Sequence, residues 1–165
     1  MKPRVLIIVG SDSDLTIMEN AGKTLEELDI AYEITIASAH RTPERVMILA
    51  SQAEEKGIEV IITGAGMAAH LAGIVAAHTI LPVIGVPIDS SPLKGIDSLL
   101  SIVQMPVGVP VATVAIGKAG AKNAAILSAQ IIGRKDPVVA AKLKTLKKKM
   151  TEEVENKAKM LRKTK

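Results

Sequence analysis

A histidine and an arginine stand side by side in the segment Ser38-Ala39-His40-Arg41, directly after an apolar run. Histidine is the side chain that exchanges a proton near neutral pH, and arginine suits a phosphate or a carboxylate. The pair falls between an expected strand and an expected helix. We therefore expect a site in which His40 moves a proton and Arg41 holds an anion. On these residues alone, the alternative is a surface histidine beside a solvated arginine.

A second polar segment, Gly10-Ser11-Asp12-Ser13-Asp14, also joins an expected strand to an expected helix. Free backbone N–H groups and the helix dipole make such a junction favourable for anions. The segment is neither a Walker A loop nor G-x-G-x-x-G, because the second glycine and the lysine are missing. Since two carboxylates would repel a phosphate, we expect one of them to face a sugar hydroxyl or to cap the helix; simple capping is the alternative.

A third segment, Gly64-Ala65-Gly66, precedes a helix of small residues with His70 in its first turn. His70 is interpreted as a partner of the site, with a core role as the alternative, and His78 as structural. The chain has no cysteine and no H-E-x-x-H motif, so we expect no metal site. No serine lies in a G-x-S-x-G context, which leaves hydrolase chemistry unsupported.

The elements that must position these segments alternate between strand and helix, which favours a parallel sheet with helices on both faces. Five strands fit the order 2-1-3-4-5 of a three-layer α/β/α flavodoxin-like domain, whose ligands bind beyond the carboxyl ends of the strands. Residues 5–9 read as a buried central strand, and the alternation in 32–36 reads as an edge strand. The remaining strands are expected at 60–63, 82–87 and 111–116, and the helices at 14–28, 42–56, 67–79, 98–105, 121–132 and 137–163.

The length of 165 residues suits one domain. We expect residues 1–133 to form its body, and 134–165 to form a basic terminal helix that packs on the body or on a neighbouring subunit. Tyr32 is the only residue with a Phe, Tyr or Trp ring, so we expect no binding that relies on base stacking. The net charge of +4 divides into −4 for the body and +8 for the tail. Without a visible signal peptide or membrane span, we expect a soluble cytoplasmic protein that binds neither nucleic acid nor membrane.

Several motifs, in order over residues 4–133, resemble the N5-carboxyaminoimidazole ribonucleotide mutase family of purine biosynthesis. They include the three segments above, Ala68-Ala69-His70-Leu71, and the run 97–117. The resemblance implies the flavodoxin-like fold and a homo-octamer with sites at subunit interfaces, where residues 98–106 line a neighbour's site. It also implies an isomerase that moves a carboxylate from the exocyclic nitrogen of the imidazole to carbon 4, without cofactor, ATP or metal.

The resemblance also implies roles for individual residues. His40 is the expected general acid and base. The ribonucleotide is expected to bind to Ser11, Asp14 and Arg41, with Ser38 in the phosphate site. The expected lining of the pocket that holds carbon dioxide is Ser13, Ala65, Gly66, His70 and Leu71.

Two residues depart from the family pattern: Met67 stands where a glycine is usual, and Ala72 where a proline is usual. Methionine takes a positive φ at a cost, so the shape of the carbon dioxide pocket is the feature in question. The alternative reaction is direct carboxylation of aminoimidazole ribonucleotide by free carbon dioxide. The motifs Arg41-Thr42-Pro43 and Ala68-Ala69-His70 favour the mutase over that branch. A nucleotide-binding protein without catalysis is a further alternative.

Overall fold

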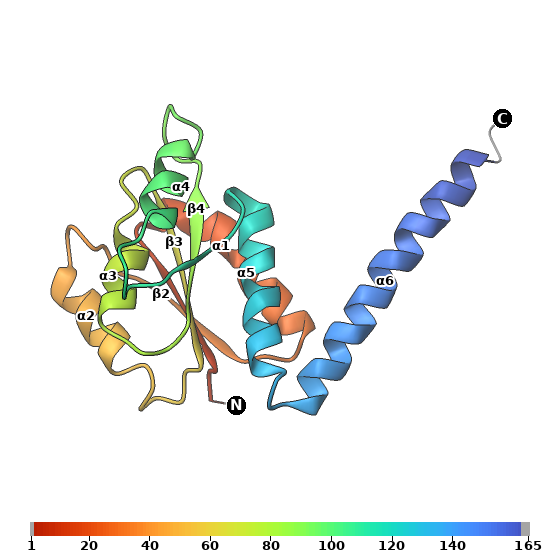
Figure 1. Cartoon of the computed structure of the whole chain (residues 1–165), viewed down its shortest axis with the longest axis horizontal. Helices are drawn as coiled ribbons and strands as arrows, with labels where there is room; N and C mark the ends of the chain where they lie inside the picture. Colours follow the sequence, from red (N-terminus) through yellow and green to blue (C-terminus); the bar gives the residue numbers. More distant parts are fainter. Residues whose placement is uncertain (1, 163–165) are drawn as a thin grey trace.

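The computed structural model describes residues 2–162 and confirms the expected fold, a parallel sheet in the order β2-β1-β3-β4-β5 (Figure 1). The strands are β1 (Val5–Val9), β2 (Tyr32–Ile36), β3 (Val60–Gly66), β4 (Val83–Ile88) and β5 (Ala112–Thr113). The helices are the 3₁₀ turn η1 (Asp12–Asp14), α1 (Leu15–Glu27), α2 (Pro43–Ser51), α3 (Leu71–Ala77), α4 (Ile96–Val103), α5 (Gly117–Ile132) and α6 (Pro137–Arg162).

The hydrophobic patterns of the strands explain their places in the sheet. All five residues of β1 are buried, as a strand with neighbours on both sides and helices on both faces requires. The alternating β2 is partly exposed and forms one edge. Val9, the last residue of β1, pairs with Ile36, the last residue of β2, so the polar segments after these two strands begin at one level. Val9 also pairs with Gly64 of β3, a strand that continues to Gly66 and so includes the segment that was expected to follow it.

Two apolar cores hold the three layers together. On one face of the sheet, α1 and α5 contribute Met18, Leu25 and Ala125 to a buried cluster. On the other face, α2, α3 and α4 contribute residues such as Val46 and Val75. Figure 1 shows α1 and α5 to one side of the sheet and the other three helices to the opposite side.

Tyr32 connects the edge strand β2 to α1 by a packing contact and a hydrogen bond. Its ring covers Gly22, where an added Cβ would lie 2.5 Å from the phenol oxygen. The phenol donates a 2.8 Å hydrogen bond to Glu26 of α1. Burial and the Glu26 carboxylate raise the pKa of Tyr32, so this hydroxyl stays protonated at neutral pH.

Several element boundaries differ from the sequence-based expectation. The regular helix α2 ends at Ser51 instead of Lys56. The residues after it form tighter turns with hydrogen bonds between residues three apart, such as the one from the Gly57 N–H to the Glu54 carbonyl. The strand β5 has two residues instead of six. The helix α3 begins at Leu71, so His70 precedes the first helical residue. The helix α5 begins at Gly117, four residues earlier than expected.

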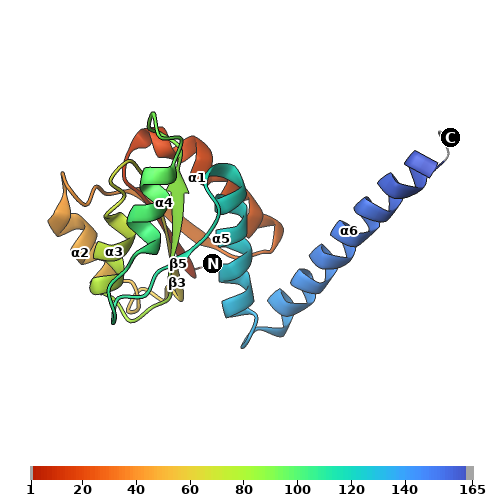
Figure 2. The same ribbon diagram turned by 45° about the horizontal axis from the view of Figure 1, so that its top comes forward.

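The terminal helix α6 begins against α5 and then extends away from the body (Figures 1 and 2). Val139 is buried, and Leu143 and Leu146 pack on the core, whereas Met150 and Val154 are exposed. Asp136 fixes the start of this helix. Its carboxylate accepts hydrogen bonds from the N–H groups of residues 138 and 139 and forms a 2.6 Å ion pair with Arg4. The expected end of this helix, Lys163, lies outside the described residues.

Candidate active site

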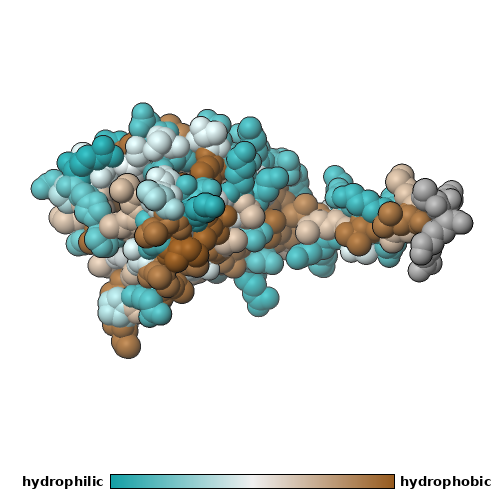
Figure 3. Space-filling model, turned by 90° about the horizontal axis from the view of Figure 1, so that it is seen from above, coloured by the Kyte–Doolittle hydropathy of each residue, from teal (hydrophilic) through white to brown (hydrophobic). Residues whose placement is uncertain are grey.

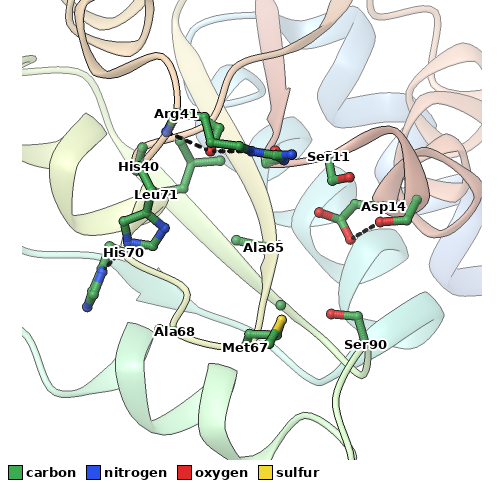
Figure 4. Close-up of a pocket in the computed structure, with 15 residues that line it drawn as sticks. Ser11, Asp14, His40, Arg41, Ala65, Met67, Ala68, His70, Leu71 and Ser90 are labelled. Atoms are coloured by element: carbon green, nitrogen blue, oxygen red, sulfur yellow. Dashed lines mark hydrogen bonds between the residues drawn. The ribbon is translucent and has the colours of Figure 1, made fainter.

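A cavity of about 530 Å³ opens at the carboxyl ends of the strands. Its walls come from the segments that follow β1, β2 and β4, and from the end of β3 together with the loop after it (Figure 4). All ten residues predicted from the sequence as site residues line it: Ser11, Ser13, Asp14, Ser38, His40, Arg41, Ala65, Gly66, His70 and Leu71. The fold therefore brings the three polar segments together, as the rule for open α/β sheets predicts.

The segment after β2 forms a turn that hydrogen bonds from Thr42 to Ser38 stabilise. The hydroxyl of Thr42 accepts a 2.9 Å hydrogen bond from the Ser38 N–H and donates one of 3.2 Å to the Ser38 carbonyl. Thr42 stands at the N-cap position of α2, which starts at Pro43, but its side chain makes no capping hydrogen bond. Its hydroxyl instead fixes the turn that presents His40 and Arg41.

Arg41 connects two walls of the cavity. One terminal nitrogen donates a 3.1 Å hydrogen bond to the carbonyl of Gly10, in the segment after β1. Its backbone N–H donates a 3.2 Å bond to the hydroxyl of Ser38. The guanidinium is thus oriented before any ligand arrives, and it places a positive charge at the edge of the cavity beside two serine hydroxyls (Figure 4).

His40 and His70 touch each other at the cavity wall, with 2.6 Å between Nε2 of His40 and Nδ1 of His70. The rings meet edge to face, with centroids 4.9 Å apart and planes at 83°. One proton lies between the two nitrogens, and which ring donates it depends on the tautomers. This contact fixes the orientation of the His40 imidazole at the place where a proton donor and acceptor is expected.

The structure separates the two aspartates of the segment after β1. Asp14 is buried, lines the cavity and makes no capping hydrogen bond, so it is the carboxylate of this segment that faces the cavity (Figure 4). Burial raises the pKa of Asp14, and the nearby Asp12 adds to this effect, while hydrogen bonds from Ser13 and Ser11 oppose it. Asp12 is exposed, and a hydrogen bond from the Ser11 hydroxyl lowers its pKa.

The substitution Asp14→Asn is expected to raise the free energy of unfolding at pH 7. Because burial raises the pKa of Asp14 in the folded state, its ionised form costs stability above that pKa. The gain should disappear as the pH falls toward about 4, where the unfolded carboxyl also becomes protonated. Urea unfolding at pH 7 and pH 4 measures this difference, and the matched control Asp12→Asn should give no gain at pH 7. A lower stability of Asp14→Asn at pH 7 would contradict the prediction.

The loop between β3 and α3 places Met67 at φ +55°, in the left-handed region. This conformation costs a residue with a side chain on the order of 1 kcal/mol. Met67 therefore takes a backbone conformation that favours glycine. Ala72, the second departure from the family pattern, is buried in α3 and does not line the cavity.

Sequence reasoning missed Ser90, which follows β4 and also lines the cavity. The same rule that identified the other segments, a polar residue after a strand, would have found it. Within residues 2–162, no group of three or more His, Cys, Asp or Glu side chains is arranged to hold a metal ion. In the same range, no helix has the length and apolar character needed to cross a membrane.

Comparison with known proteins decides the family. A family model described as AIR carboxylase, where AIR denotes aminoimidazole ribonucleotide, matches residues 4–153. The chain belongs to this family. The resemblance found in the sequence motifs is thereby confirmed, and the match extends beyond residue 133 into α6.

Curated relatives within the AIR carboxylase family carry the name N5-carboxyaminoimidazole ribonucleotide mutase. The protein of Pyrococcus horikoshii is 62% identical over 160 residues, which cover 97% of this chain and 89% of the relative. The protein of Thermotoga maritima is 62% identical over 159 residues, covering 96% and 92%. The Escherichia coli K12 protein is 51% identical over 151 residues, covering 92% and 89%.

A solved structure supports the same assignment of the fold. The crystal structure of Treponema denticola PurE superposes with a TM-score of 0.87 at 31% sequence identity. The superposition covers 96% of this chain and 98% of that one. The family model therefore covers most of the chain and ends within α6.

Proposed function

We propose that this protein converts N5-carboxyaminoimidazole ribonucleotide to 4-carboxy-5-aminoimidazole ribonucleotide in purine biosynthesis. The name of its relatives, N5-carboxyaminoimidazole ribonucleotide mutase, supports this proposal. The observation that carries the proposal is the His40 imidazole, oriented by His70 at the wall of a cavity that is lined with backbone and small side chains. The cytoplasm is the proposed location.

The reaction needs one group that both gives and takes a proton. When the bond from the exocyclic nitrogen to the carboxylate breaks, its electron pair returns to the nitrogen, which accepts a proton from His40. Carbon 4 then attacks the carbon dioxide, and the proton on carbon 4 passes to His40. The histidine ends as it began, so no external acid, base or oxidant is consumed.

The other residues of the cavity fit the parts of a ribonucleotide. Arg41, with the hydroxyl of Ser38 beside it, provides a charge-assisted site for the phosphate. The buried carboxylate of Asp14 is placed to accept hydrogen bonds from sugar hydroxyls, and Ser11 supplies a further hydroxyl. These roles orient the imidazole toward His40.

Direct carboxylation of aminoimidazole ribonucleotide is the second candidate, because the family model itself is described as AIR carboxylase. Proton NMR separates the two reactions. Purified protein receives N5-carboxyaminoimidazole ribonucleotide in one sample, and aminoimidazole ribonucleotide with low bicarbonate in another. Rapid conversion in the first sample alone supports the mutase, efficient turnover in the second supports the carboxylase, and neither reaction from folded protein would refute both.

The contact between the histidines predicts the behaviour of His70 variants. His70→Leu is expected to lower kcat about tenfold, the equivalent of one lost hydrogen bond. His70→Asn should recover part of this loss, because an amide atom can take the place of Nδ1 beside His40. Steady-state kinetics of both variants checks the prediction, and equal activity of the leucine and asparagine variants would contradict a role through this contact.

We also propose a homo-octamer. The face of α4 that carries Ile96, Leu100 and Val103 exposes these large apolar side chains, as do the outer turns of α6 (Figure 3). Contact with further copies of the chain would cover them. Light scattering coupled to size-exclusion chromatography should give eight times the chain mass of 17.3 kDa, and a monomer mass would refute the proposal.

A further inference from the structure

Asp12 is the charged residue of the segment after β1 that the proposed reaction does not use. Its side chain is exposed and lies outside the lining of the cavity, whereas its neighbours Ser11 and Ser13 belong to that lining. Ser11 is the N-cap of the turn η1, but its hydroxyl makes no capping hydrogen bond. The Ser11 hydroxyl is bonded to the Asp12 carboxylate instead.

This hydrogen bond takes the only proton of the Ser11 hydroxyl. The distance from Ser11 Oγ to Asp12 Oδ1 is 2.9 Å. A hydroxyl has one proton to donate and two lone pairs, so Ser11 presents only lone pairs to the cavity while the bond to Asp12 lasts. Hydrogen bonds to a carboxylate are stronger than those between neutral groups. An anionic ligand that needs the Ser11 proton must therefore compete with Asp12 for it.

Asp12 also acts on the cavity through its charge. Arg41, the residue proposed to hold the phosphate, donates a 3.1 Å hydrogen bond to the carbonyl of Gly10, two residues before Asp12. The hydrogen bond from Ser11 and, to a smaller extent, the Arg41 guanidinium lower the pKa of Asp12, so its carboxyl group is ionised at neutral pH. A phosphate that binds to Arg41 and Ser11 is repelled by this negative charge.

We propose that Asp12 limits the affinity of the cavity for the phosphate of the ribonucleotide, because its carboxylate holds the Ser11 proton and opposes the charge of Arg41. The inference rests on the proposed function, in which the phosphate binds beside Arg41. Contacts that hold substrate and transition state equally lower KM without raising kcat, and tight binding of the same phosphate in the product slows its release. Asp12 thus keeps the exchange of ribonucleotides fast.

Binding measurements with and without the phosphate group test this proposal. Isothermal titration calorimetry gives the Kd of aminoimidazole ribonucleotide and the Kd of its riboside, which lacks the phosphate. The variant Asp12→Asn removes the charge and keeps the shape of an exposed side chain, so it retains the fold, as circular dichroism verifies. The control Glu55→Gln removes one negative charge from an exposed residue between α2 and β3, outside the cavity.

Asp12→Asn is expected to bind the ribonucleotide about fivefold more tightly, the upper range for one exposed charge pair, and to bind the riboside with an unchanged Kd. Glu55→Gln should leave both values unchanged. A double-mutant cycle isolates the part played by the Ser11 proton. In the background Ser11→Ala, which has no hydroxyl proton to release, the gain from Asp12→Asn should fall to about twofold.

Equal or weaker binding of the ribonucleotide by Asp12→Asn, an equal gain for the riboside, or the same gain in Glu55→Gln would overturn the role of Asp12 and leave the mutase reaction standing. An undiminished gain in the Ser11→Ala background would overturn the competition for the Ser11 proton. Failure of the unsubstituted protein to bind the ribonucleotide would refute the proposed function itself, and the role of Asp12 with it.

Discussion

Replacement of His40 by asparagine is expected to reduce turnover by at least about 100-fold, the usual contribution of a general acid and base. Asparagine keeps a polar group at the cavity wall but cannot carry a proton between the exocyclic nitrogen and carbon 4. Substrate binding should change little, because the proposed phosphate and ribose contacts belong to Arg41 and Asp14. Single-turnover kinetics and a binding titration with the same substrate measure the two effects separately.

His78→Asn provides the matched control for this experiment. His78 is also exposed, but it lies at the end of α3, outside the cavity that holds His40. Its replacement should leave turnover unchanged. The His40 side chain supports no buried packing, so circular dichroism and thermal unfolding of His40→Asn should match the parent. Near-normal turnover in folded His40→Asn would remove His40 from the mechanism and favour a binding protein without catalysis.

The largest effect on stability is expected from Gly120→Ala. Gly120 is buried in the first turns of α5, and an added Cβ would overlap the carbonyl oxygen of Ala115 and lie 2.7 Å from its carbonyl carbon. Because the two nearest atoms belong to the backbone of Ala115, no flexible side-chain end can move aside to relieve this collision. We expect a loss of at least about 3 kcal/mol in the free energy of unfolding, the upper range for an overpacked core. Urea unfolding at pH 7 measures it.

Gly73→Ala tests whether the loss at Gly120 comes from this collision or from glycine replacement in a helix as such. Gly73 lies within α3, where an added Cβ would meet the Met105 sulfur at 3.0 Å, at the flexible end of that side chain. Alanine is favoured over glycine inside helices by about 1 kcal/mol. Stability should therefore be unchanged or higher. A loss as large as that of Gly120→Ala would contradict the explanation by backbone collision.

The sheet was predictable because its hydrophobic patterns differ from strand to strand. Five consecutive apolar residues in Val5–Val9 indicate a strand that is covered on both faces, and the alternation in Tyr32–Ile36 indicates an edge. Helix ends were less predictable. The change to tighter turns after Ser51 leaves no signal in residue types, because the same residues suit an α-helix and a 3₁₀ turn.

The place of the site was predictable from the polar residues that follow the first three strands, but its internal contacts were not. Thirty residues separate His40 from His70, and only the parallel order of β1, β2 and β3 brings them to 2.6 Å. The different roles of Asp12 and Asp14 depend on the 3₁₀ turn that buries one carboxylate and exposes the other. The left-handed backbone of Met67 could not be predicted from its residue type, because methionine disfavours a positive φ.

The contact between Tyr32 and α1 has a spectroscopic consequence. With no tryptophan and no second tyrosine in the chain, all ultraviolet emission from aromatic side chains originates at this single ring. A phenol that donates to a carboxylate, as Tyr32 does to Glu26, should have quenched emission in the folded protein and brighter emission once α1 separates from β2. The ring lies beside Gly22, away from the residues that line the cavity. Every variant of a cavity residue therefore keeps the same fluorescent reporter of folding. Its signal follows the edge of the sheet independently of events at His40.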